Sequence, residues 1–129
     1  MQTTTHVDLS RIPGFYDTLA TLPSGDSRMV QCHVRSSRLK DFLRLTRSAP
    51  LRDACACVPA AAVLRSGILG PGKPHPALAN RLGDYTLFAA PGTAFLYPAA
   101  MAKEKKPKAG THGGLSADEL RIPLYVIRP

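Results

Sequence analysis

The stretch RMVQCHVRSSRLKDFLRLTRSAPLRDACACVPAAAVLRS, residues 28–66, decides the fold class. Apolar and polar residues alternate over 30–34, as in a strand with one buried face. The spacing of apolar and basic residues over 36–47 predicts an amphipathic helix. A second strand is expected over 53–58. A second helix should run from Pro59 to Gly67, because proline favours a helix start and glycine a helix end.

This order of strand, helix, strand and helix is a βαβα pattern, which predicts an α/β fold with a mixed sheet and short flanking helices. Two arrangements fit the pattern: the strands lie side by side in parallel, or another strand lies between them. The 129 residues are enough for one domain with a real core. We therefore expect a single domain over 1–129, with the βαβα segment at 28–66 and further strands within 84–129.

The segments on either side of this centre give weaker patterns. Residues 1–6 show no periodicity and are expected to form a loose lead-in. His75 stands between two prolines and is expected to be an exposed loop side chain rather than a ligand. The other expected elements, in chain order, are an amphipathic turn capped by Asp8 or Ser10, a rigid loop over 68–76, a helical turn over 77–82, and two strands over 84–90 and 93–97 joined as a hairpin at Pro91-Gly92.

The composition is that of an ordinary globular chain, with 44% hydrophobic and 20% charged residues. No apolar run approaches the ~20 residues that a membrane helix needs. The first residues lack the basic and apolar regions of a signal peptide, so a cytoplasmic location is the default expectation. Lys and Arg outnumber Asp and Glu by 17 to 9, which gives a net charge of +8. That excess favours anionic partners such as phosphate esters, nucleic acid or acidic protein surfaces.

Three cysteines are present, and Cys55 and Cys57 would point to the same side of a strand. We expect these thiols to be small core side chains in a reducing compartment. A redox or metal protein built on Cys32, Cys55 and Cys57 is the alternative, although no second Cys-x-Cys pair completes a tetrahedral set.

The last twenty residues, GTHGGLSADELRIPLYVIRP, carry the clearest local signals. Ser116 and Glu119 have the spacing of a capping box, so a short helix should begin at about Ala117. Leu115 and Leu120 would form the matching hydrophobic staple. The helix must stop before Pro123.

The apolar residues after this helix, Ile122 and 124–127, predict a largely buried strand. Upstream, Gly113 and Gly114 allow a positive φ or a close approach to another group. That geometry presents the imidazole of His112 from a tight turn that leads into a helix. From the residues alone, His112 is either an ordinary loop side chain or a metal ligand.

The run from Thr111 to Ser116, with the acidic pair and the apolar residues behind it, resembles the C-terminal metal-ligand segment of the alkaline phosphatase superfamily. The closest likeness is to its type I phosphodiesterase/nucleotide pyrophosphatase branch, where the His of this turn is one ligand of a two-zinc site. The resemblance implies that His112 is a zinc ligand and that the substrate is a phosphate ester or nucleotide. It also implies that the fold is part of an alkaline-phosphatase-like α/β sandwich.

The likeness covers nearly the whole chain, including the loop at 67–76 and the Arg81-Leu82-Gly83-Asp84 step into a strand, where Arg81 and Asp84 are expected to be structural. The family also needs a Thr or Ser nucleophile and further Asp and His ligands. This chain contains neither Asp-His nor Asp-x-x-x-His, and Thr3, Thr4, Thr5 and Thr111 match no nucleophile motif.

One His does not hold zinc tightly, and His6, His33 and His75 do not supply the missing carboxylates. We therefore expect the C-terminal segment of such a hydrolase, as a truncated reading frame or a fragment, that is catalytically silent alone. A separately encoded N-terminal half could complete it. An incomplete sheet of this kind should also leave an apolar edge exposed and favour self-association.

The run KEKKPK at 103–108 is the densest charge cluster. It is expected to be a solvated loop, and Lys103, Lys105, Lys106 and Lys108 could still steer a phosphorylated substrate toward the metal site. The alternative function is a small basic module that binds nucleic acid or an acidic protein through this loop and the helix at 38–47. Only 8 aromatic residues and no Trp disfavour a stacking platform for single strands.

Overall fold

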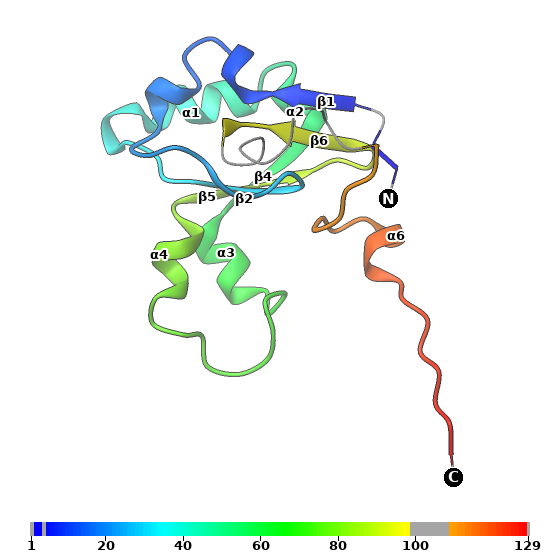
Figure 1. Ribbon diagram of the computed structural model, residues 1–129. Helices are drawn as coiled ribbons and strands as arrows, with labels where there is room; N and C mark the ends of the chain where they lie inside the picture. The colour runs from blue at the N-terminus through cyan, green and yellow to red at the C-terminus, as the bar shows by residue number, and fades with distance from the viewer. Residues whose placement is uncertain (1, 4, 99–108, 129) are drawn as a thin grey trace.

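The computed structural model describes residues 2–3, 5–98 and 109–128 and has a mixed α/β fold with two sheets and short helices (Figure 1). The predicted α/β class is therefore confirmed at this level. The elements in chain order are β1 (Thr5–Asp8), η1 (Leu9–Arg11), η2 (Tyr16–Thr18), β2 (Ser24–Asp26), β3 (Met29–Cys32), η3 (Ser36–Arg38), α1 (Leu39–Thr46), α2 (Leu51–Ala54), β4 (Cys55–Pro59), α3 (Ala60–Arg65), α4 (Leu78–Leu82), β5 (Tyr85–Ala89), β6 (Thr93–Leu96) and α6 (Ala117–Leu120).

The main sheet has four strands in the order β2-β3-β5-β4. Both β3 and β4 run antiparallel to β5, so they are parallel to each other with β5 between them. Of the two predicted arrangements, the split pair is the one found. β5 suits the central place because 86–89 are all buried, and a strand with two covered faces needs apolar residues on both.

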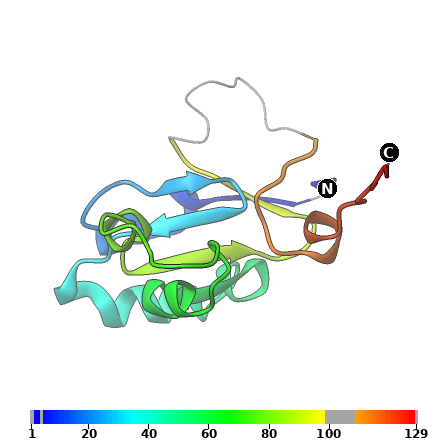
Figure 2. The same ribbon diagram turned by 90° about the horizontal axis from the view of Figure 1, so that it is seen from below.

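Helices cover both faces of this sheet (Figures 1 and 2). Leu87 points to the larger core, which includes Phe42 of α1 and Leu51 of α2. Phe88 points the opposite way, to a smaller core with Val63 of α3. Successive residues of one strand thus serve two cores, as the alternation of a pleated strand requires.

The two helices predicted in the βαβα segment are confirmed. Of the segment predicted at 36–47, residues 36–46 are helical, first as η3 and then as α1, and the side chain of Phe42 is fully buried. Pro59 is the N-cap of α3, and Gly67 behind the helix has a φ of 71°. The strand expected to start at Asp53 starts instead at Cys55, because Asp53 still lies in the short helix α2.

The predicted hairpin between 84–90 and 93–97 is wrong. β6 pairs in parallel with β1, with Val7 opposite Phe95, in a separate two-stranded sheet. The loose lead-in expected at 1–6 is also corrected, since β1 begins at Thr5. The partners of β6 are distant in the sequence: besides its pairing with β1, the amide of Phe95 donates to the carbonyl of Ser27 at 2.7 Å.

The strand predicted at Ile122 and 124–127 is wrong as well. Residues 121–128 have neither helix nor strand, and the large apolar side chains among them are 72–93% exposed. They extend away from the body in both views (Figures 1 and 2). A β-branched and aromatic run indicates burial, but a strand forms only beside a partner strand. No strand of the described chain lies beside this segment.

The α-helices of the described chain are short, and none is long and apolar enough to cross a bilayer.

Candidate functional site

The turn at 110–120 keeps the local structure that the sequence predicts. Ser116 is the N-cap of α6, and the capping box with Glu119 is formed. The Ser116 amide donates to Glu119 Oε2 at 3.2 Å, and the Ser116 hydroxyl donates to the same oxygen at 2.5 Å. Leu115 and Leu120, predicted as a staple, are both exposed.

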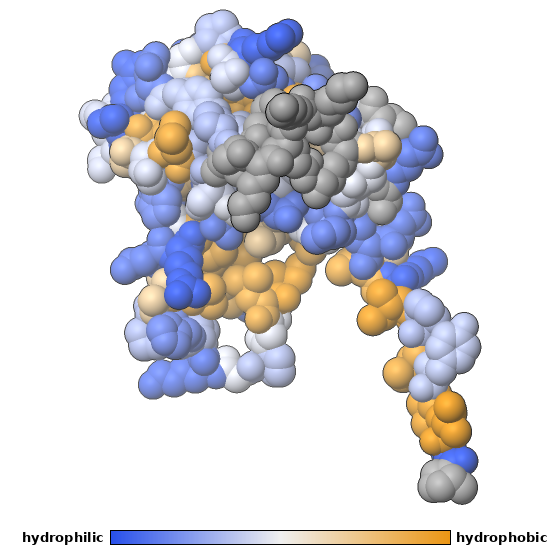
Figure 3. Space-filling view, in the orientation of Figure 1, coloured by the Kyte–Doolittle hydropathy of each residue, from blue (hydrophilic) through white to orange (hydrophobic). Residues whose placement is uncertain are grey.

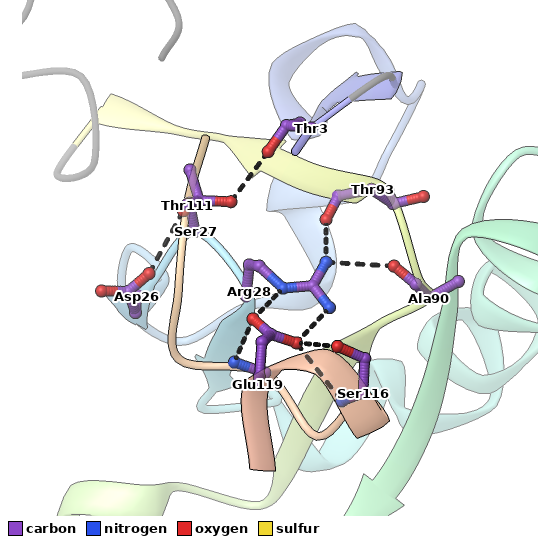
Figure 4. A network of polar contacts seen from close by, with 10 residues as sticks. Thr3, Asp26, Ser27, Arg28, Ala90, Thr93, Thr111, Ser116 and Glu119 are labelled. Carbon is purple, nitrogen blue, oxygen red and sulfur yellow. Dashed lines mark hydrogen bonds and ion pairs between the residues drawn. The ribbon is translucent and has the colours of Figure 1, made fainter. Parts of the chain in front are cut away.

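Glu119 also binds an arginine from the far side of the sequence (Figure 4). Arg28 Nε donates to Glu119 Oε1 at 2.7 Å, and Arg28 Nη2 donates to Oε2 at 2.8 Å. The side chains are 0% and 6% exposed. A bidentate arginine–carboxylate pair of this kind is among the strongest polar contacts in proteins. It attaches the turn to the folded body.

The remaining nitrogen of Arg28 faces the chain between β5 and β6. Nη1 donates to the carbonyl of Ala90 at 3.0 Å and also to the carbonyl of Thr93. A buried guanidinium needs all of its N–H groups satisfied. Arg28 therefore joins β3, the start of β6 and α6 in one buried network.

Sequence reasoning missed Arg28. Its partners Ala90, Thr93 and Glu119 lie 62, 65 and 91 residues away, so no local pattern connects them. The one available signal was a charged residue directly before an alternating strand.

The glycines of the turn fulfil the predicted close approach. A Cβ on Gly114 would lie 2.6 Å from Arg28 Nη2 and 2.6 Å from Glu119 Oε2. The Gly114 amide donates to Glu119 Oε1 at 3.0 Å. Gly113 has a φ of 95°, and its Cβ position would lie 3.3 Å from the carboxyl carbon of Asp26. A side chain at 114 would thus disturb the pair of Arg28 and Glu119, and a side chain at 113 would meet Asp26.

A second contact holds the upstream end of the turn. The hydroxyls of Thr111 and Thr3 are 2.9 Å apart, and Gly110 forms a bridge with Gln2. His112 lies between these two anchors, one residue after Thr111 and two before Gly114. Its own side chain is exposed. The backbone of His112 is therefore fixed while its imidazole faces solvent.

Electrostatics favour the charged form of Glu119 strongly. The Arg28 guanidinium, assisted by hydrogen bonds from Ser116 and Gly114, lowers the pKa of Glu119 from 4.5 to about 2. Donors on a carboxylate stabilise its ionised state. Glu119 is thus an anion at every ordinary pH and serves as an anchor, not as a proton-transfer group.

The described residues do not by themselves fit a zinc site. Within that part of the chain no three His, Cys, Asp or Glu side chains form a group that could hold a metal ion. His112 and His75 are both exposed, and the carboxylate of Glu119, within the turn, is already paired with Arg28. The lysine candidates Lys103, Lys105, Lys106 and Lys108 lie outside the described residues.

The three cysteines are free thiols. Cys32 is buried, and Cys55 and Cys57 both pack against the larger core, which confirms that they share one side of β4. Burial raises the pKa of Cys55 to about 12 and raises the pKa of Cys32 and Cys57. The thiols are therefore protonated at neutral pH and are poor nucleophiles.

The basic surface of α1 is partly neutralised. Arg38 and Arg44 both pair with Asp41, at 3.2 and 3.4 Å. Asp84 accepts a hydrogen bond from the Val34 amide at 2.7 Å, which is the structural role expected for it. Arg81 is exposed on α4.

Comparison of the chain with protein-family models, with curated proteins and with solved structures found no match.

Proposed function

We propose that this chain is the C-terminal segment of a metal-dependent phosphodiesterase or nucleotide pyrophosphatase-like hydrolase, to which it supplies one zinc ligand, His112. Zinc would act in such an enzyme as a Lewis acid at the phosphoryl group. The chain's contribution is to hold one imidazole at a fixed point. The missing nucleophile and the other ligands would come from another polypeptide, such as a separately encoded N-terminal half.

One observation carries this proposal: the backbone on both sides of His112 is anchored while its imidazole is exposed. Thr111 is bonded to Thr3, and Gly114 sits against the buried pair of Arg28 and Glu119. A metal ligand is most effective when its backbone is held by the scaffold and only its side chain reaches outward. The net charge of +8 adds a general attraction for anionic phosphate esters.

The test measures zinc content and the hydrolysis of bis-p-nitrophenyl phosphate and its monoester. The chain alone should bind no stoichiometric zinc and show no turnover. Co-expression with a polypeptide that carries the family's nucleophile and the Asp and His ligands should give a zinc-dependent hydrolase. Activity should be lost with His112→Ala and kept with His75→Ala, a matched exposed histidine.

Two results would contradict the proposal in different ways. If the chain alone held two zinc ions and turned over substrate, the site would be complete and further ligands would lie within these residues. If the co-expressed complex were equally active with His112→Ala, His112 would not be a ligand.

The second candidate function is a small basic binding module for nucleic acid or an acidic protein. The observation in its favour is an open pocket of about 500 Å³ whose lining includes Arg47, Arg52 and Tyr85. A gel shift at low salt should then be weakened by Arg47→Ala and by added salt. Absence of any shift at low salt would remove this candidate.

A further inference from the structure

An apolar groove opens between α3 and the root of the C-terminal tail. It has a volume of about 410 Å³, and its lining includes Ala56, Val58, Val63, Ile68, Phe88 and Leu115. Among the described residues that line it, none is charged. Figure 3 shows the corresponding apolar surface below the body, between the lobe that carries α3 and the projecting tail. A groove of this composition favours an apolar occupant over an ion or a sugar.

The groove lies over an unpaired margin of the main sheet. β4 is the last strand in the order β2-β3-β5-β4, so one of its edges pairs with no strand in the part of the chain described. Ala56 of β4 is exposed, although it faces the same side as Phe88. Open edges with apolar surroundings are sites where another segment adds to a sheet.

The tail has the complementary property. Ile122, Leu124, Tyr125, Val126 and Ile127 are 72–93% exposed, whereas monomeric proteins rarely present so many neighbouring apolar side chains to water. The composition is β-branched and aromatic, which suits an added strand. Charges stand only at its ends, at Arg121 and Arg128.

We propose that two copies of this chain exchange their C-terminal tails, each laying residues 122–127 into the groove of its partner. The tail of one copy extends away from its own body in both views, so a second copy is the occupant that its direction favours (Figures 1 and 2). Leu115, near the root of the tail, already lines the groove, so the path of one tail is continuous with the site that receives the other. The exchange is self-complementary, as a two-fold dimer requires.

The area matches a small but specific dimer interface. In a strand only alternate side chains face one side, so three apolar side chains of each tail, at 122, 124 and 126, enter the partner's groove. Burying each removes roughly 100 Å² from water, so two tails remove about 600 Å². With a similar area lost by the surfaces that receive them, the total is about 1,200 Å², at the lower end of standard protein interfaces. The inference does not depend on the proposed hydrolase function, because it concerns other residues and another observable.

The experiment is sedimentation equilibrium of the full chain over about 1–100 μM at 0.15 M salt, with four proteins. The wild type should be a dimer. Leu124→Asp/Val126→Asp, which places charges on one side of the tail strand, and Ala56→Asp in the groove should each raise the dimer dissociation constant by about 100-fold or more. Leu22→Asp, at an exposed leucine outside the tail and the groove, is the matched control and should remain a dimer.

Far-UV circular dichroism checks that every variant is folded. Tryptic cleavage after Arg121 reports on the tail independently, and it should slow as the wild type dimerises. A wild type that stays monomeric at 100 μM would overturn the proposal, whether Arg121 is cleaved rapidly or is protected by the chain's own groove. A dimer that persists in both the tail and the groove variants, or a larger open assembly, would overturn it as well.

Discussion

The last twenty residues contain two regions that differ in their contacts: one is attached to the body, and the other is exposed. The turn at 110–120 is attached to the body by Arg28, 91 residues away from its partner Glu119. The tail at 121–128 directly follows the turn, and within the described residues it makes no comparable contact with the body. Both regions give strong signals in the sequence, one a capping box and the other an apolar β-rich run. The difference teaches that a cap is complete within four residues, whereas an apolar strand depends on a surface that its own sequence does not specify.

The largest effect is expected when the pair of Arg28 and Glu119, which anchors the turn, is removed. Arg28→Ala should lower the free energy of unfolding by about 3–5 kcal/mol, because it leaves Glu119 as a buried unpaired charge. The carbonyls of Ala90 and Thr93 also lose their donor. Urea denaturation followed by far-UV circular dichroism measures the change.

The control for this prediction is an arginine of the same type in an exposed pair. Arg11 pairs with Asp8 at 3.4 Å, and the Arg11 side chain is 87% exposed. Arg11→Ala should change the free energy of unfolding by less than about 1 kcal/mol. Equal effects of Arg11→Ala and Arg28→Ala would mean that the buried pair does not hold the turn.

Acid should weaken the same pair by protonating Glu119. The pKa of Glu119 is about 2 in the folded chain and 4.5 ordinarily, so the pair contributes stability above pH 4.5 that is lost as the pH falls toward 2. The loss corresponds to about 3 kcal/mol. The stability advantage of the wild type over Glu119→Gln, measured from urea midpoints, should therefore shrink from pH 5 to pH 2. An advantage that stays constant over that range would contradict the assignment.

A smaller effect tests the packing around the anchor. A Cβ on Gly114 would meet Arg28 and Glu119 at 2.6 Å, so Gly114→Ala should lower the free energy of unfolding by about 1–3 kcal/mol. Gly67→Ala is the comparison, since Gly67 has a positive φ and open space around it. Thermal melts in the Arg28→Ala background separate the two: the Gly114 effect should shrink there, because only the contact with Glu119 remains, and the Gly67 effect should persist.

The smallest effect is expected in the tail. Leu124 is 86% exposed, so Leu124→Asp should change the free energy of unfolding by less than about 0.5 kcal/mol at protein concentrations below dimerisation. A cost of 2 kcal/mol or more, typical of a buried leucine, would show that the tail packs within the monomer.

The sequence was sufficient where the deciding contacts are local. The Ser116 and Glu119 box, the helix between Pro59 and Gly67, and the alternation that buries Val30 and Cys32 all follow from spacings of a few residues. These features fixed the helices and the position of His112 on a tight turn.

The sequence was insufficient where the paired residues are far apart in the chain. Thr93 to Leu96 reads as a strand, but nothing nearby states that its partner is β1 rather than β5. The partners of Arg28 are equally remote, so the residue that attaches the candidate site to the fold gave no recognisable pattern. The strand predicted for the tail was wrong for the same reason, because apolar character predicts burial but does not identify the surface against which the segment packs.

Amide hydrogen exchange, measured along the C-terminal twenty residues at several protein concentrations, tests the central contrast most directly. At low concentration the amides of Gly114 and Ser116, which donate to Glu119, should be protected, and those of 122–127 should exchange as in a free peptide. Raising the concentration should protect the tail alone. Equal and rapid exchange of turn and tail, or a tail protected at the lowest concentration, would contradict the account of an anchored turn followed by an unpartnered tail.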